Sequence, residues 1–332
     1  MSYTETTLIR SKQIIISNHL IDLGIDNVRQ EIIQGLLSKQ KYISSKFFYD
    51  EKGSRLFEDI THLPEYYPTR TEKGILKKIA PEIMENVKNI DIVELGSGDC
   101  SKISILLNSI TKENLNSINY IPIDVSHSAI QKSAETLNEL FPELSINGLV
   151  ADFINQINKI PNTRKRLFCF LGSTIGNFSE NIINKFLNNL CSNMNTGDSF
   201  LLGIDLEKSD RILHAAYNDR QNITAEFNKN ILSVINNLIK SDFNENDFEH
   251  QAFFNKEKSR IEMHLVANKD LKVTSPFLQS KIEFQKGDNI HTENSYKFSL
   301  DKIYKLEQKS GLEIKQIYSD VNTWFSLILF RK

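Results

Sequence analysis

Two glycines lie between two acidic residues in Glu94-Leu95-Gly96-Ser97-Gly98-Asp99, a stretch whose residue types suit a ligand-binding turn. The apolar run over residues 90–95 predicts a strand buried on both faces. The two glycines permit a sharp turn and close approach of a ligand to the backbone. Ser101 is expected to cap a helix over residues 101–107. Strand, glycine turn and helix together are typical of a nucleotide-binding α/β fold.

The spacing argues against a dinucleotide as the ligand of this turn. A dinucleotide fingerprint needs a third small residue at its sixth position, where a pyrophosphate sits on the helix end, and this chain has Ser101 there. Glu94 and Asp99 add negative charge in the same place. An acidic turn suits a cationic or zwitterionic ligand such as S-adenosylmethionine, and the stretch resembles the first motif of class I methyltransferases. A tight turn without a ligand remains the alternative.

Two further acids lie where expected strands end. Asp124 follows a strand predicted over residues 120–123, and Asp152, with Phe153 beside it, follows one over residues 144–150. Ligands bind beyond the carboxyl ends of strands in open α/β sheets. Either aspartate alone is explained as a helix cap or turn residue. Acidic strand ends in this order beside an acidic glycine turn favour a binding edge.

The elements that must position these residues alternate between strand and helix, as a doubly wound sheet requires. Further strands are predicted over residues 167–171 and 199–204, and a helix over about residues 72–87 leads into the glycine stretch. The strand over 167–171 ends in Gly172-Ser173-Thr174-Ile175-Gly176-Asn177. Candidate ligand-binding residues therefore follow several successive strands.

The alternation breaks over residues 219–290, which predict an insertion with a long helix, capped by Thr224, and antiparallel strands. A helix over residues 300–310 and two strands, over 314–318 and 323–330, then close the sheet, with the last strand antiparallel. The first 20 residues show no clear pattern and are expected to be loosely ordered.

Composition excludes several classes of protein. The 332 residues are 25% charged and 40% hydrophobic with a net charge of −2, so neither nucleic acid nor an anionic membrane is an expected partner. The three cysteines form no CxxC pair, and residues 1–17 contain no apolar core of signal-peptide length, so a cytoplasmic protein is expected. The seven histidines show no ligand spacing, and no metal is expected. The balanced charge favours a monomer.

Aromatic residues gather in two neighbouring stretches, residues 46–57 and 63–70, outside any obvious strand. Aromatic hydroxyls on loops often line pockets for small ligands. A packed aromatic corner without a ligand is the alternative on composition alone.

Taken together, these stretches make the chain resemble the histidine-specific α-N-methyltransferase family. That family makes hercynine (N-α-trimethylhistidine), the first intermediate of ergothioneine biosynthesis. The likeness runs from about Leu20 to Lys332 in one order. The stretches that carry it are Phe48-Tyr49-Asp50, Leu63-Pro64-Glu65-Tyr66-Tyr67-Pro68-Thr69-Arg70, Glu94-Leu95-Gly96-Ser97-Gly98, Gly172-Ser173-Thr174-Ile175-Gly176-Asn177, Tyr217-Asn218-Asp219, Thr224-Ala225-Glu226-Phe227-Asn228 and Thr292-Glu293-Asn294-Ser295.

The resemblance implies an α/β fold with a class I methyltransferase (Rossmann-like) sheet over residues 71–207 and 297–332, which binds S-adenosylmethionine and releases S-adenosylhomocysteine. It also implies a second, α+β domain that binds the substrate, built from the N-terminal segment, residues 19–70, and the insertion, residues 208–296. The implied cofactor residues are Gly96, Lys102, Asp124, Asp152 and Phe153.

The resemblance also implies roles toward histidine. Asn177 and Tyr217 would bind the carboxylate. Tyr49 would lie near the reacting amine and the sulfonium, and Phe57 would shape that wall. Our own hypothesis is catalysis mainly by alignment, with Tyr49, Asn177 and the Gly172 carbonyl holding the amine. The imidazole would meet Tyr66, Met263, Glu293 and Ser295. Ser173 departs from the family, where many members have glycine, and puts local backbone freedom in doubt.

Elementary chemistry supports the imidazole assignment independently. A neutral imidazole offers one N–H donor and one acceptor nitrogen, which Glu293 and a hydroxyl of Ser295 or Tyr66 would satisfy. An indole lacks the acceptor nitrogen, so the pair disfavours methylation of an indole compound, the second possibility. Met263 alternates with apolar neighbours and suits a core position equally well. A binding module for S-adenosylmethionine without catalysis is the third possibility.

Overall fold

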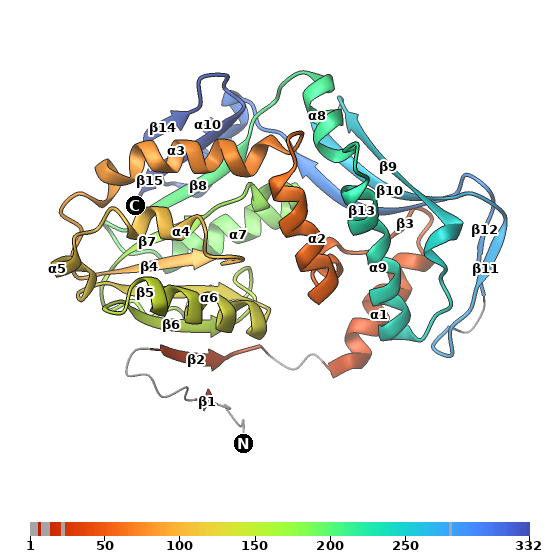
Figure 1. Cartoon of the computed structure of the whole chain (residues 1–332), viewed down its shortest axis with the longest axis horizontal. Helices are drawn as coiled ribbons and strands as arrows, with labels where there is room; N and C mark the ends of the chain where they lie inside the picture. The colour runs from red at the N-terminus through yellow and green to blue at the C-terminus, as the bar shows by residue number, and fades with distance from the viewer. Residues whose placement is uncertain (1–5, 8–13, 21–23, 279–280) are drawn as a thin grey trace. The chain divides into compact units, whose positions relative to one another are not determined.

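The computed structural model describes residues 6–7, 14–20, 24–278 and 281–332. The chain divides into two compact units, each assembled from segments far apart in the sequence (Figure 1). Unit 1 consists of Met1–Ile21, Arg70–Leu206 and Phe298–Lys332, and unit 2 of Asp22–Thr69 and Glu207–Lys297. Among the helices of the described ranges, none is long and apolar enough to cross a membrane.

Unit 1 is built on a nine-stranded sheet in the order β1-β2-β6-β5-β4-β7-β8-β15-β14. Strands β2, β6, β5, β4, β7 and β8 run parallel, and β15 pairs antiparallel with both β8 and β14. The bounds are Thr6–Thr7, Ile14–Asn18, Ser145–Val150, Asn119–Asp124, Ile90–Leu95, Lys165–Phe170, Ser199–Asp205, Phe325–Arg331 and Glu313–Ser319 in that order. The predicted α/β fold with an antiparallel last strand is confirmed.

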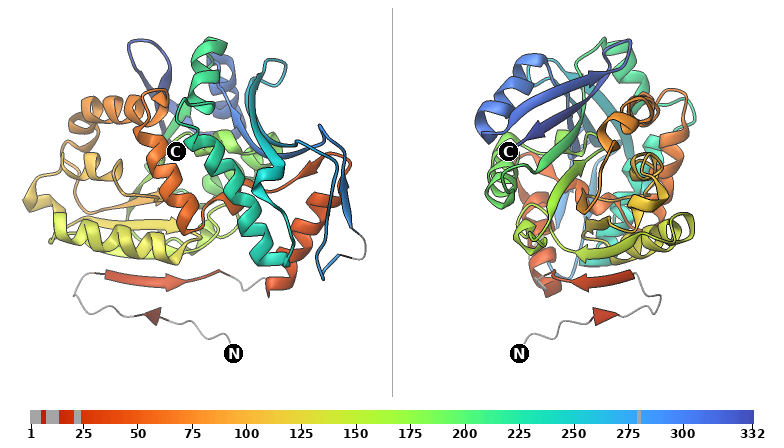
Figure 2. Two further views of the ribbon diagram at one scale, coloured as in Figure 1. Left: turned by 45° about the vertical axis from the view of Figure 1, so that its right-hand side comes forward. Right: turned by 90° about the vertical axis from the view of Figure 1, so that its left-hand side faces the viewer.

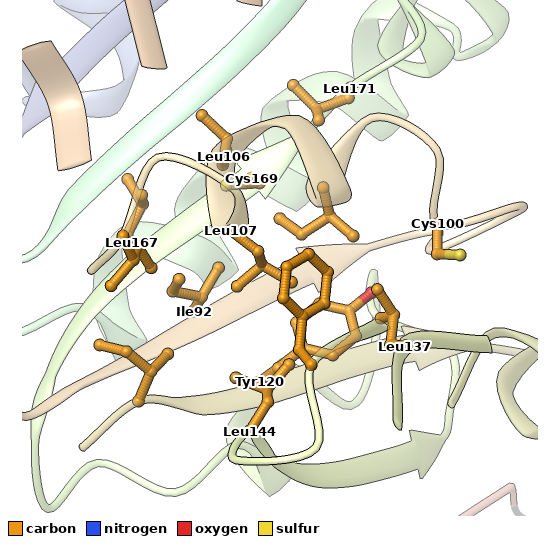
Figure 3. Packing of buried hydrophobic residues seen from close by; sticks show 14 of the residues in the cluster. Ile92, Cys100, Leu106, Leu107, Tyr120, Leu137, Leu144, Leu167, Cys169 and Leu171 are labelled. Carbon is orange, nitrogen blue, oxygen red and sulfur yellow. The ribbon is translucent and has the colours of Figure 1, made fainter. Parts of the chain in front are cut away.

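Helices cover both faces of this sheet because its central strands are apolar on both sides. On one face α3 (Tyr67–Met84), α4 (Ile103–Leu107) and α6 (His127–Leu140) enclose a core cluster. Figure 3 shows Leu106 and Leu107 of α4 among Ile92, Tyr120 and Leu167 of the strands. Each fully buried side chain of this size contributes about 1.5–3 kcal/mol relative to its exposed state.

The opposite face is rich in phenylalanine. Phe186 of α7 (Glu180–Asn193) lies with its ring centroid 5.1 Å from that of Phe170, and the rings of Phe200 and Phe330 stack at 5.8 Å. Helix α10 (Leu300–Ser310) packs beside α7. The large rings fill this layer and hold the ends of β7 and β8 in place.

The expectation of loose order before residue 20 is wrong for the strand β2. Its isoleucines pair in parallel register with β6, Ile14 opposite Ile146, and Ile14 and Ile16 are buried while Ile15 is exposed. This alternation is the pattern of a strand with one covered face and one exposed face. In both views of Figure 2 this strand is the long red arrow near the N-terminus. Residues 1–5 and 8–13 of the same expectation lie outside the described residues.

Two predicted helix caps, Ser101 and Thr224, are also wrong. Helix α4 begins two residues after Ser101, whose N–H and hydroxyl both donate to the Asp99 carboxylate at 3.2 and 2.9 Å. Helix α9 (Ile223–Ile239) begins before Thr224, and the Asp219 carboxylate accepts from the N–H groups of Ile223 and Thr224 at 3.0 and 2.8 Å. At α9 a nearby carboxylate, the stronger acceptor, therefore replaces the Thr224 hydroxyl. At α4 the Ser101 hydroxyl is engaged by Asp99, and the N-cap position falls on Lys102, without a side-chain cap.

Unit 2 contains a four-stranded sheet in the order β3-β13-β10-β9, with bounds Lys41–Tyr42, Asn289–Tyr296, Arg260–Ala267 and Phe248–Asn255. Helices α1 (Gly24–Leu37), α2 (Glu51–His62), α8 (Asp210–Tyr217) and α9, the short helix η1 (Ser45–Phe48) and a separate hairpin of β11 (Leu271–Val273) and β12 (Ile282–Phe284) complete it. The predicted hairpin of β9 and β10 and the long helix α9 are confirmed.

A β-bulge interrupts the pairing of β10 with β13. Met263 pairs with Glu293, but the next residue, His264, pairs with His291, so Thr292 is the extra residue. Because of this extra residue, the side chains of β13 that share one face of the sheet are shifted by one position across the bulge. The Thr292 hydroxyl donates to Asn228 of α9 at 2.7 Å, which fixes the bulge against the helix.

Candidate functional site

In unit 1 the glycine turn follows β4 directly, and both glycines require their freedom of conformation. Gly96 has φ +70° and Gly98 φ +50°, the left-handed region that favours glycine. The Gly96 N–H donates to the Ile123 carbonyl at 2.8 Å, which ties the turn to the end of β5. The turn therefore lies at the carboxyl edge of the parallel strands, where α/β folds bind ligands.

Asp124 ends the neighbouring strand and faces backbone N–H groups. Its carboxylate accepts from the Ser126 N–H at 2.9 Å. Burial raises the pKa of Asp124, and hydrogen bonds from the backbone of Ser126, Gly98 and Val125 oppose that rise. The Ser126 hydroxyl caps α6 by accepting from the Ala129 N–H at 3.2 Å. Asp124 is thus held beside the glycine turn by the backbone.

Asp152 and Phe153 follow β6 at the same edge. The Asp152 carboxylate accepts from the Ile154 N–H at 2.9 Å and from the Asn155 amide, which are the bonds of a turn residue. Phe153 lies edge-on to Phe170 at 5.3 Å and is partly exposed. A Cβ on Gly96 would come within 3.9 Å of the Phe153 ring, so the glycine turn and this aromatic face are neighbours.

Lys102 pairs with an acid that the sequence analysis missed. Its Nζ lies 3.0 Å from the carboxylate of Glu72 on α3, whose side chain is wholly buried. Glu72 also accepts from the Gly172 N–H, at 2.8 and 3.0 Å from its two oxygens. One carboxylate therefore links a predicted cofactor residue to the loop after β7. A lone glutamate at the start of a helix gives no sequence signal of this role.

The loop after β7 turns through two residues of positive φ. Gly172 has φ +82°, and Ser173, where many family members have glycine, has φ +56°. The Ser173 hydroxyl accepts from the Asp205 N–H at 2.8 Å, a bond that compensates for the unfavourable backbone. Asn177 ends the short helix η3 (Thr174–Asn177) of this loop and is partly exposed.

Contrary to the expectation from the sequence, Glu94 does not place a negative charge at the glycine turn. The side chain is buried and accepts a hydrogen bond from the Tyr120 hydroxyl in the core. Burial raises its pKa to about 8, against the hydrogen bond from Tyr120 and the charge of Lys102. At neutral pH the Glu94 carboxyl is therefore largely protonated.

In unit 2 the aromatic residues form a cluster with Phe227 at its centre. The Phe227 ring stacks on Phe48 at 4.5 Å and lies 5.9 Å from both Tyr49 and Phe57. Phe57 lies edge-on to Tyr66 at 6.3 Å. Phe48 and Phe227 are buried, whereas Tyr49 is 45% exposed, so the cluster has a packed base and an accessible rim.

The start of α2 fixes the position of Tyr49. Asp50, the next residue, caps the helix by accepting from the Gly53 N–H at 2.7 Å, and Asn230 of α9 donates to the same oxygen at 2.8 Å. A Cβ on Gly53 would lie 1.7 Å from the Phe48 carbonyl, so only glycine fits there. The aromatic segment is therefore locked against α9.

Tyr217, at the end of α8, belongs to a buried hydroxyl network with β13. Its hydroxyl donates to Ser295 Oγ at 2.7 Å, and the ring of Tyr66 lies edge-on to it at 6.4 Å. Lys297 donates from Nζ to the same two oxygens, to Ser295 at 2.8 Å and to Tyr217 at 3.1 Å. The structure thus brings together three predicted substrate residues and adds a lysine that sequence reasoning missed.

Glu293 and Met263 face each other across the pairing of β13 and β10. Glu293 is partly buried and Met263 is 2% exposed. Burial raises the pKa of Glu293 to about 7, while the charge of Lys297 lowers it. Because residues 293 and 295 alternate on one strand, Glu293 and Ser295 share a face of the sheet. A carboxylate and a hydroxyl therefore stand together there.

A second polar cluster, Glu262, His264 and His291, joins the same two strands, with candidate ligand atoms within 4.8 Å of one another. Sequence spacing gave no sign of it, since the bulge creates the pairing of His264 with His291. Arg260 donates to Glu262 at 2.6 and 2.8 Å, and His264 bonds Glu262 and Asn289 at 3.2 and 3.0 Å. The cluster's carboxylate is therefore already neutralised by a cation.

Solved structures resemble the chain in fold. The mitomycin 7-O-methyltransferase MmcR matches with a TM-score of 0.50 at 10% sequence identity, over 93% of this chain and 67% of that one. Identity this low supports the fold alone, which agrees with the strand order of unit 1.

Sequence comparison identifies the family. The histidine N-α-methyltransferase of Mycolicibacterium smegmatis is 36% identical over 315 residues, 95% of this chain and 98% of the relative. Ergothioneine biosynthesis protein 1 of Schizosaccharomyces pombe is 27% identical over 89% of this chain, which matches 39% of that longer relative. A family model described as histidine-specific methyltransferase, SAM-dependent, matches residues 28–332. The chain therefore belongs to the S-adenosylmethionine-dependent, histidine-specific methyltransferases.

Proposed function

We propose that this chain methylates the α-amino group of L-histidine, up to three times, and so forms hercynine for ergothioneine biosynthesis. The observation that carries the proposal is the pair of Glu293 and Ser295 on one face of β13, a carboxyl with a pKa of about 7 beside a hydroxyl. A neutral imidazole offers the complementary donor and acceptor. The family membership supports the same reaction.

The carboxyl edge of unit 1 fits S-adenosylmethionine. Gly96 and Gly98 keep side chains away from the turn, and Asp124 and Asp152 supply carboxylates for hydroxyl and amine donors. Phe153 offers a partly exposed ring, which suits an adenine. Lys102, held by Glu72, completes the proposed cofactor residues. The bound cofactor supplies an electrophilic methyl group on a sulfonium.

The residues assigned to the substrate act mainly by orientation. The acceptor must be a neutral amine, although an α-amino group is mostly protonated at neutral pH, with a pKa of about 8 even at a peptide terminus. Binding the deprotonated fraction and aiming its lone pair removes the need for a strong base, because positioning two reactants contributes roughly 7–11 kcal/mol. We assign this alignment to Tyr49, Asn177 and the Gly172 carbonyl, and we expect Tyr49→Phe to change turnover or the order of methylation.

The other substrate residues are assigned to different groups of the histidine molecule. Tyr217 and Asn177 are assigned to the carboxylate, and Glu293 with Ser295 or Tyr66 to the two imidazole nitrogens. A site that pairs both nitrogens rejects side chains that lack them, since its own polar groups would be left unpaired. Phe57 and Met263 complete the apolar surroundings, and the burial of Met263 is also consistent with a purely core position.

One experiment tests the proposal against both alternatives. The protein is incubated with S-adenosylmethionine and a panel of free amino acids, including tryptophan, and masses are read for one, two or three added methyl groups. Three additions to histidine support the proposal. Preferred methylation of tryptophan or another amine favours the second possibility, and the absence of any product with intact cofactor binding favours the non-catalytic module.

We further propose that the enzyme acts as a monomer in the cytoplasm. The net charge of −2 and three cysteines that all remain free thiols support this. Light scattering on the purified chain measures the mass, and a dimer mass would contradict the first part of the proposal.

Loss of ergothioneine in a deletion strain, restored by added hercynine, tests the proposed place of the enzyme in ergothioneine biosynthesis.

A further inference from the structure

Lys297 is a lysine with no exposed surface that directly follows β13. Burial of a charged group costs free energy unless partners compensate for the lost water. Its ammonium donates to Ser295 Oγ at 2.8 Å and to Tyr217 Oη at 3.1 Å, and lies 5.0 Å from the centroid of the Tyr217 ring. Both hydroxyls belong to residues that the proposed function assigns to the substrate.

The direction of the hydrogen bonds follows from the chemistry of an ammonium, which only donates. Ser295 Oγ therefore accepts from Lys297, and it also accepts from the Tyr217 hydroxyl at 2.7 Å. A serine hydroxyl has two acceptor positions and one hydrogen. Both acceptor positions are filled, and no acceptor for the remaining hydrogen is found within the residues that the structure describes.

We propose that Lys297 is a positioning residue that makes Ser295 an obligate hydrogen-bond donor and so selects a substrate side chain with an acceptor nitrogen. Glu293 on the same strand is the matching acceptor. The two residues together would then admit imidazole in one orientation and disfavour side chains that only donate or have no polar atom. This inference rests on the proposed function, because the acceptor nitrogen is that of histidine.

The test is a double-mutant cycle on histidine methylation with Lys297→Met, Ser295→Ala and the double variant. Methionine matches lysine in volume, and replacing a buried charge by an apolar group of this size is often tolerated by the fold. We expect Lys297→Met to lower kcat/KM for histidine about 10- to 100-fold, through KM more than kcat. Removal of Lys297 is expected to cost much less in the Ser295→Ala background than in the wild type, because its main effect passes through that hydroxyl, and any remaining loss reflects its bond to Tyr217.

Lys208→Met is the matched control. Lys208 also donates to a tyrosine hydroxyl, that of Tyr67 at 2.8 Å, and lies 4.4 Å from its ring, but it does not bond Ser295. The kcat/KM of the Lys208→Met variant for histidine is expected to stay within about twofold of wild type. Lys297→Gln, which retains donors without the charge, is expected to recover part of the loss and serves as the second variant if Lys297→Met unfolds.

Two results would overturn the inference. Unchanged selectivity in the folded Lys297 variants would do so, and so would losses that multiply in the double variant, the signature of a merely structural lysine. Failure of the proposed function is distinguished by the wild-type protein, which would then not methylate histidine in the same assay. Binding of S-adenosylhomocysteine, measured by calorimetry on each variant, is expected to be unchanged.

Discussion

The two units present their candidate residues in different ways. In unit 1 they follow the ends of parallel strands, and Asp124 and Asp152 bond to backbone N–H groups of their own loops. In unit 2 Tyr217 ends a helix and Ser295 lies within a strand. These two residues and Lys297, which follows the strand, bond to one another across distant segments. Backbone geometry positions one set of side chains, and a side-chain network positions the other.

This difference suggests a division of labour that substitutions can break. A change in unit 1 should weaken cofactor binding equally for every acceptor. A change in the network of unit 2 should alter which acceptor is used and leave the cofactor unaffected. A single substitution that did both would contradict the division.

The largest effect is expected for Glu293→Ala. The substrate imidazole would lose its acceptor while its N–H stayed in a buried site, and kcat/KM for histidine should fall about 10³-fold. Kinetics on histidine and tryptophan measure the acceptor preference, and calorimetry with S-adenosylhomocysteine measures cofactor binding. Glu283→Ala is the control, since Glu283 is an exposed glutamate of the same unit, paired with Lys272. Unchanged preference for histidine would refute the imidazole assignment.

Asp124→Ala should have the next largest effect. Hydrogen bonds to a charged group contribute about 1.5–3 kcal/mol, so the Kd for S-adenosylhomocysteine should rise about 10- to 100-fold. The relative rates for different acceptors should not change. Glu139→Gln, on the exposed side of α6, is the control for lost charge. A change in acceptor preference instead of affinity would show that Asp124 serves the substrate.

Glu72→Gln is expected to act mainly on stability. The amide keeps an acceptor for the Gly172 N–H but removes the ion pair with Lys102, whose side chain is 19% exposed. Because Lys102 retains some contact with water, the free energy of unfolding should fall by about 1–2 kcal/mol, less than for a fully buried pair. Urea denaturation measures it. An unchanged midpoint together with normal cofactor affinity would argue that Glu72 has no positioning role.

The smallest effect concerns pH. The pKa of Glu293 is about 7, raised by burial, so its carboxylate form increases as pH rises through 7. The ratio of kcat/KM between wild type and Glu293→Gln should rise with pH below 7, by at most about tenfold per unit, and level off above it. Titration of the substrate amine cancels in this ratio. A ratio independent of pH would mean that ionisation of Glu293 is not required.

The same shift has a consequence for stability, with a definite sign. The folded pKa of Glu293 lies above the ordinary value of 4.5, so the unfolded chain loses this proton first. The contribution of Glu293 to the free energy of unfolding is therefore greatest below pH 4.5 and declines as pH rises from there to about 7. Glu293→Gln should remove that decline.

Sequence reasoning succeeded where structure is local. The glycine turn and the acids after β5 and β6 follow from hydrophobic runs of strand length and from residues that change the direction of the chain. It failed for the caps expected at Ser101 and Thr224, because these residues compete with the nearby carboxylates of Asp99 and Asp219. Spacing alone does not rank such competitors.

Long-range pairing explains the other omissions. Glu72 stands between Arg70 and Lys73, and Lys297 between Tyr296 and Phe298, so neither differs in sequence from an ordinary surface charge. Only the packed units reveal that both are wholly buried. The extra residue Thr292 leaves no trace in the pattern of β13, although it decides that His291 pairs with His264. The roles at Tyr66, Tyr217 and Glu293 came from family resemblance and not from periodicity.

The interleaved order of the two units has a consequence for synthesis on the ribosome. Unit 2 is complete once residue 297 has emerged, whereas the sheet of unit 1 still lacks β15, the strand that joins β8 to β14. Domains tend to fold as their chains become available. The unit proposed to choose the substrate can therefore finish folding first, although its sequence interrupts the other, and a truncation after residue 297 should leave β8 as an open edge prone to aggregation.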